Sequence, residues 1–72
     1  MREIRAEMAA SVWQMRVEVG QRVGPNDELM ILESMKMEIP VVAQVRGTVH
    51  ELVVAVGAAV QDGDVLALIQ ED

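Results

Sequence analysis

The chain contains an internal repeat, and this feature limits the folds open to it more than any other. Shifting the sequence by 37 residues aligns residues 4–33 with residues 41–70 without a gap. Eight aligned pairs are identical: Ala6/Ala43, Val12/Val49, Val17/Val54, Val19/Val56, Gly20/Gly57, Val23/Val60, Asp27/Asp64 and Leu29/Leu66. Because glycine and aspartate recur at fixed offsets, we interpret the match as a structural repeat rather than as chance pairing of valines.

The pattern within each half is typical of short strands. Apolar residues alternate at 15–19 and again at 52–56, which predicts a strand in each half. Turn-forming residues follow, and they lead into apolar runs at 29–32 and 65–69. No segment combines the period and the length of a helix. We therefore predict an all-β chain with about four short strands in each half.

The two halves are expected to share one hydrophobic core. A four-stranded half alone would leave an apolar sheet face in water, and 72 residues suffice for only one small domain. Residues 1–72 are therefore predicted to form a single domain, a flattened eight-stranded barrel-sandwich of two four-stranded halves. An approximate two-fold axis should relate the repeats. The 37-residue shift carries the linker 34–40 onto the two chain ends. The linker and the chain ends should therefore lie at opposite ends of the molecule.

Charge and composition exclude several classes of function. The chain has 6 basic and 12 acidic side chains, a formal net charge of −6, and one aromatic residue, Trp13. Nucleic-acid binding needs clustered cations and aromatic platforms, so we expect no nucleic-acid partner. The longest stretch without a charged residue, 52–61, is too short to span a membrane, so we expect no membrane partner either.

Thiol and metal chemistry are also excluded by composition. Cysteine is absent and histidine occurs once, which rules out disulfides, thiol catalysis and a multi-histidine metal site. The one histidine, His50, aligns with Trp13 in the repeat. That alignment favours matched strand positions over a catalytic role, and we assign neither residue a function. We expect a monomer in a reducing cytoplasm.

Lys36 is the only lysine in the chain, beside five arginines. It lies between the repeats, where the sequence predicts a strand, a tight turn with Met35 and Lys36 at its tip, and a second strand. Tight hairpin turns prefer Asn-Gly, Asp-Gly or glycine at positions of positive φ, and this turn has none of them. Turn residues that ignore local chemistry are expected where function constrains them. Spacing alone is equally compatible with a longer, ordinary loop that exposes a lysine.

The residues around this lysine resemble a known attachment motif. The segment Glu33-Ser34-Met35-Lys36-Met37-Glu38 is similar to the motif of biotinyl domains, the biotin carboxyl carrier and biotin/lipoyl attachment family, whose core is Met-Lys-Met. The valine and glycine frame on both sides is similar as well, so the resemblance covers about residues 4–70. It implies a flattened eight-stranded barrel with biotin attached covalently to Lys36. It also implies that Met35, Met37 and Glu33 are read by the attaching enzyme.

The resemblance implies a carrier rather than an enzyme. A biotin protein ligase would modify Lys36, and biotin would then carry carboxylate between a biotin carboxylase and a carboxyltransferase. An amine attacks an acyl group only when neutral, and nearby carboxylates favour its charged form, so the ligase must supply the base. The absence of any linker or inserted loop makes a free-standing biotinyl domain the expected form.

Two alternatives belong to other functional classes. The first is a lipoyl carrier of similar fold, although lipoyl lysines in that family typically follow aspartate and precede a small residue, unlike Met35 and Met37. The second is an unmodified interaction module, in which Lys36 is an ordinary surface residue.

Overall fold

The computed structural model describes residues 1–72 and contains eight strands and no helix. The strands are β1 (Arg2–Arg5), β2 (Ala10–Met15), β3 (Arg22–Val23), β4 (Glu28–Ser34), β5 (Met37–Val42), β6 (Gly47–Leu52), β7 (Ala59–Val60) and β8 (Val65–Glu71). The all-β prediction is therefore confirmed. No segment of the structure is a helix long and apolar enough to cross a membrane.

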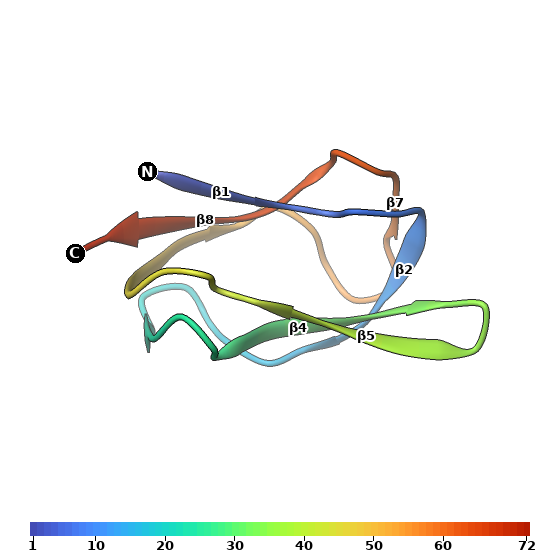
Figure 1. The fold of residues 1–72 in the computed structure, drawn as a ribbon, viewed down its shortest axis with the longest axis horizontal. Helices are drawn as coiled ribbons and strands as arrows, with labels where there is room; N and C mark the ends of the chain where they lie inside the picture. Colours follow the sequence, from blue (N-terminus) through green and yellow to red (C-terminus); the bar gives the residue numbers. More distant parts are fainter.

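The strands form two four-stranded antiparallel sheets that face each other (Figure 1). One sheet has the order β1-β8-β6-β3, and the other has the order β5-β4-β2-β7. Each sheet therefore takes two strands from each half of the chain. Each half of the chain contributes four strands, β1–β4 and β5–β8, as predicted, but the two halves are interleaved and neither forms a sheet of its own. The interleaving makes the core common to both repeats.

The 37-residue shift relates the two sheets strand by strand. It places β2 on β6, β3 on β7 and β4 on β8 with identical bounds, and it converts one sheet order into the other. Backbone hydrogen bonds follow the same shift. The amide of Gly20 donates to the carbonyl of Val49 at 2.8 Å, and the amide of Gly57 donates to the carbonyl of Val12, also at 2.8 Å. Each repeat therefore donates backbone hydrogen bonds to a strand of the other repeat.

The core lies between the two sheets and is wholly apolar. No buried side chain is polar or charged, and no buried polar atom lacks a partner. The cluster contains Ile4, Ala6, Val12, Val17, Val23, Leu29, Met30, Leu32, Ala43, Val49, Val60, Leu66, Ala67 and Ile69. Burial of each large aliphatic side chain contributes about 1.5–3 kcal/mol, so this shared cluster is the main source of stability.

The strand predicted at 15–19 is wrong in its position, and so is its counterpart at 52–56. The observed strands end at Met15 and Leu52, and the next residues run into turns. Val19 and Val56 are 61% and 59% exposed, because each directly precedes a glycine with φ of 93° in a turn. Glycine adopts this backbone conformation without strain, so the turn overrides the strand propensity of the valines.

Candidate functional site

The only lysine lies on a two-residue turn between β4 and β5. Ser34 pairs with Met37 across these strands, which leaves Met35 and Lys36 as the whole connection. The tight turn is thus confirmed, and the longer loop is excluded. Figure 1 shows this hairpin at one end of the long axis, with both chain ends at the other, as the repeat predicted. The molecule measures 35 × 18 × 17 Å, so the lysine lies far from the termini.

The backbone of this turn is strained. Met35 and Lys36 have φ of 52° and 65°, so both lie in the left-handed region. Two successive residues with positive φ match a type I′ hairpin, where asparagine and glycine are strongly preferred. A residue with a Cβ in this region costs roughly 1–2 kcal/mol. Strain of this kind concentrates at functional sites, and here it coincides with the only side-chain amine.

Strand β4 provides the hairpin with a rigid base. It is paired on both sides, with β2 and with β5, and residues 29–32 within it are buried. The next residues along β4 carry the chain out of the core to the turn. The position of Lys36 is therefore fixed by the best-packed strand of its sheet, although the lysine itself is exposed.

The side chains at the tip are open to solvent. Met35 is 91% exposed and Met37 is 64% exposed, far more than is usual for apolar residues of this size. Lys36 is exposed too, and it takes part in none of the four ion pairs of the structure. A free amine between two exposed thioether side chains is accessible to a partner enzyme from the tip of the molecule.

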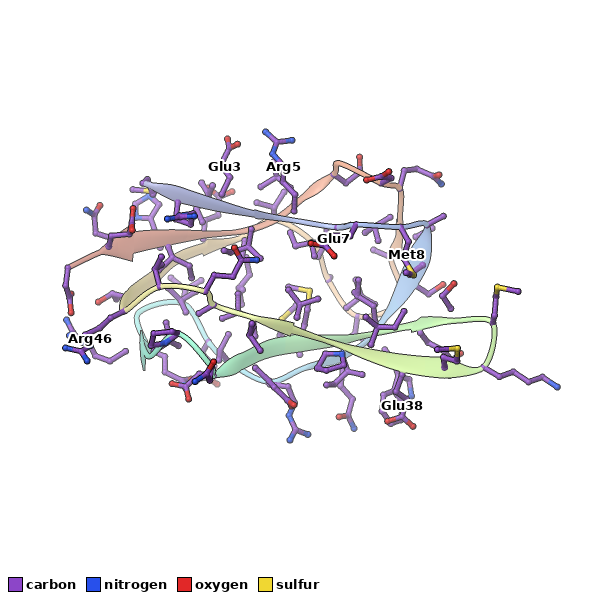
Figure 2. All side chains as sticks on the ribbon, viewed as in Figure 1. Glu3, Arg5, Glu7, Met8, Glu38 and Arg46 are labelled. Atoms are coloured by element: carbon purple, nitrogen blue, oxygen red, sulfur yellow. The ribbon has the colours of Figure 1, made fainter.

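Two carboxylates face each other at the base of the hairpin. Glu33 on β4 lies directly opposite Glu38 on β5, so their side chains share one face of the sheet. Both are exposed, and neither has a cation as an ion-pair partner. Figure 2 shows Glu38 beside the hairpin on the side away from the other sheet. Like charges in this position destabilise a sheet, which again favours a functional reason for them.

The structure places the predicted site residues together but not on one face. Met35 and Lys36 form the tip, and Glu33 lies on the outer face of the sheet. Met37 is the first residue of β5 and pairs with Ser34. Because it directly precedes Glu38 in the strand, its side chain lies on the opposite face of the sheet from Glu33 and Glu38. Sequence reasoning did not foresee that Trp13 lies on the outer face as well. The sequence marks this residue in one way, since Trp13 is the only aromatic residue in the chain.

Comparison with known proteins agrees with this site. The sequence pattern of the family described as biotin-requiring enzymes matches residues 3–69. The chain belongs to the biotin/lipoyl attachment family. It is 49% identical over 67 residues to the biotinylated protein TB7.3 homolog of Mycobacterium leprae, covering 93% of this chain and 94% of that protein. It is 43% identical over 63 residues to a biotin/lipoyl attachment protein of Bacillus subtilis, covering 88% and 86% of the two chains.

A solved carboxylase contains a domain of the same fold. The Kluyveromyces lactis urea carboxylase superimposes with a TM-score of 0.91 at 30% identity, covering 96% of this chain. The match spans only 6% of that enzyme. This member of the biotin/lipoyl attachment family therefore corresponds to one small part of a large carboxylase and to nearly the whole of its two short relatives.

The strain in the turn leads to a prediction for stability. Replacing Met35→Asn together with Lys36→Gly should raise the free energy of unfolding by about 1–2 kcal/mol, since both new residues accept positive φ. Urea denaturation of the two proteins measures the difference. Met35→Ala alone is the matched control and should give no such gain, because alanine keeps the Cβ. A double variant less stable than the parent chain would show that the turn is not strained.

Proposed function

We propose that Lys36 is the residue to which biotin is covalently attached, and that the chain serves as a biotin carrier. One observation carries this proposal. The only side-chain amine of a biotin/lipoyl attachment domain stands exposed on a strained two-residue turn, between Met35 and Met37. The biotinylated relative from Mycobacterium leprae, which aligns over nearly its full length, supports biotin rather than lipoate.

The attachment step uses only the ε-amine of this chain. The neutral amine of Lys36 attacks the carboxyl carbon of biotin in an acyl-adenylate, an amide bond forms, and AMP leaves with release of a proton. A biotin protein ligase supplies ATP, biotin and the base that takes up this proton. We accordingly assign this chain no catalytic role of its own.

The rigid hairpin has a mechanical role after attachment. Biotin supplies a ureido nitrogen on which a carboxylate group can be carried between two active sites. The lysine stem provides a flexible arm, and the paired strand β4 holds the base of that arm in a fixed place. Tethering of this kind raises the effective concentration at each active site without any new contact.

The partners follow from the carrier role. The fold is shared with a part of the urea carboxylase, so we propose a biotin carboxylase and a carboxyltransferase as the enzymes that load and unload the arm. We place the chain, as a monomer, in the cytoplasm with them. As a single folded domain, it should unfold in one cooperative transition.

Mass spectrometry of the intact chain tests this function. Incubation with a biotin protein ligase, ATP and biotin should add one biotinyl group per chain and no more, because only one lysine is present. Incubation with a lipoate ligase and lipoate should leave the mass unchanged. A lipoyl increment in place of the biotinyl one would establish the lipoyl carrier. No increment with either active ligase would overturn both carrier functions and leave the unmodified interaction module as the remaining alternative.

Replacing Met35 by alanine should weaken recognition by the ligase without changing the stability of the fold. Met35→Ala should change the free energy of unfolding by less than about 0.5 kcal/mol, because the side chain is 91% exposed. The same variant should lower kcat/KM for biotin transfer, since the ligase would lose an apolar contact beside the lysine. Met8→Ala, which removes a less exposed methionine outside the hairpin, is the control for transfer. Cooperative unfolding lost in Met35→Ala would instead make Met35 a structural residue.

A further inference from the structure

The outer face of the β5-β4-β2-β7 sheet carries an exposed tryptophan. Trp13 is 43% exposed, although tryptophan is usually well buried in a monomer. Trp13 follows the buried Val12, so the alternation of strand β2 places it on the outer face. It lies at a bulge, where Val12 pairs with Leu32 and Gln14 pairs with Ile31, so that Trp13 has no partner of its own. Bulges re-aim side chains and are treated as selected features of a fold. No group in the protein accepts a hydrogen bond from the indole.

Trp13 and one of the hairpin carboxylates line the same hollow. This shallow depression crosses three adjacent strands, with Trp13 on β2, Ile31 on β4, and Pro40 and Glu38 on β5. Glu33 lies directly opposite Glu38 and so extends the same face toward the tip. The apolar side chains of Trp13, Ile31 and Pro40 therefore lie next to an acidic edge that ends one residue before the Met35-Lys36 turn, and the hollow is also lined by Gln14, Arg16 and Glu28. We call Trp13, Ile31, Glu33, Glu38 and Pro40 the hairpin face.

Charge on the hairpin face is only partly compensated. Arg16 and Glu28 line the same hollow and form an ion pair at 3.8 Å, both groups about half exposed. Glu33 and Glu38 have no such partner. The surface therefore presents two free carboxylates next to an exposed indole. A complementary partner would offer an apolar socket edged by arginine or lysine side chains.

The repeat provides an internal comparison for this surface. The equivalent positions on the other sheet hold His50 for Trp13, Gln70 for Glu33, and Met1 for Glu38. The other sheet has the same bulge, between Val49 and Glu51, but neither the aromatic side chain nor the opposed carboxylates. Packing and strand pairing are common to both sheets, so they do not account for a difference confined to the sheet that bears Lys36.

We propose that the hairpin face is the docking surface for the biotin protein ligase, with Trp13 as its apolar anchor and Glu33 and Glu38 as its charged edge. This inference rests on the proposed function. A lysine stem is only four carbons long, so the enzyme that acylates the bare amine must pack against the flanks of the hairpin. Enzymes that act at the far end of the attached arm have no such requirement. Buried tryptophan anchors commonly dominate the binding energy of such interfaces.

Two measurements on the full chain test the proposal. The single tryptophan gives one indole NMR signal, which should shift or broaden when unlabelled ligase is added to the ¹⁵N-labelled chain. Trp13→Ala should lower kcat/KM for biotin transfer about tenfold or more, mainly through KM. His50→Ala, the equivalent position on the other sheet, should leave kcat/KM unchanged. The backbone NMR spectrum establishes that each variant is folded.

A charge variant tests the same surface without removing the tryptophan. Glu33→Gln with Glu38→Gln should lower kcat/KM about fivefold at low salt, and the difference from the parent chain should narrow as salt rises. Glu18→Gln with Glu51→Gln, which removes two exposed carboxylates outside the hairpin face, is the matched control. Biotin transfer at the parental rate by both the Trp13 and the double carboxylate variants would overturn the docking surface while leaving the carrier function intact. Failure of the parent chain to accept biotin would overturn the carrier function and this inference with it.

Discussion

Replacing Lys36 by arginine should abolish biotin incorporation completely. Arginine keeps the positive charge and the long stem, but its guanidinium is always protonated and does not attack an acyl-adenylate. The side chain at this position is exposed and forms no ion pair, so the fold should be unchanged. Intact mass after incubation with ligase, ATP and biotin measures the result. The free energy of unfolding should stay within about 0.5 kcal/mol of the parent chain.

A relocated lysine is the matched control for this variant. Arg46 is exposed in the loop between β5 and β6, and Figure 2 shows it at the end of the molecule opposite the hairpin. Lys36→Arg combined with Arg46→Lys restores one lysine per chain but should still accept no biotin. Biotin on the relocated lysine would show that any exposed amine suffices, and that the strained turn and its flanking methionines have no part in recognition.

Replacing Gly47 by alanine should cost the fold a large part of its stability. A Cβ at this position would lie only 2.1 Å from the carbonyl oxygen of Gln70 and 2.9 Å from its carbonyl carbon. Both atoms belong to the backbone of β8, a central strand that pairs with β6 and with β1, so they cannot move aside cheaply. We expect a loss of about 3 kcal/mol, at the upper end of overpacking effects. Denaturant unfolding measures it.

Gly24→Ala is the control for this effect, because its Cβ would meet nothing closer than an Asp27 carboxylate oxygen at 3.8 Å. The free energy of unfolding of Gly24→Ala should lie within about 0.5 kcal/mol of that of the parent chain. Equal stability of Gly47→Ala and Gly24→Ala would mean that β6 and β8 are not as closely paired at Gly47 as the structure has them. The repeat gives no warning of the clash, since Ala10 occupies the equivalent position in the first half.

The sequence predicted best those features of the fold that depend on the order and spacing of residues along the chain. The position of residues 34–40 between two repeats predicted a hairpin at the end opposite the termini, and the structure agrees. The all-β class followed from turn residues and apolar runs of strand length, such as 29–32, which lies within β4. These features depend on spacing along the chain, which a sequence states directly.

The parts that escaped prediction depend on exposure and register. Alternating valines at 15–19 indicated a strand, but a glycine turn takes over at Val19 and leaves it exposed. The bulge at Trp13, which leaves this residue without a partner on β4, has no local sequence signal, because it arises from the pairing of β2 with β4. The opposition of Glu33 and Glu38 likewise became visible only when the register of the hairpin was known.

The central claim is that Lys36 carries biotin, and one competition experiment tests it most directly. The parent chain is incubated with biotin protein ligase and lipoate ligase together, with ATP, biotin and lipoate, and the modified peptide is identified by fragmentation mass spectrometry. The account predicts a single biotinyl group on the peptide that contains Lys36. A lipoyl group on that peptide, or an unmodified Lys36 when both ligases are active on their own substrates, would contradict it.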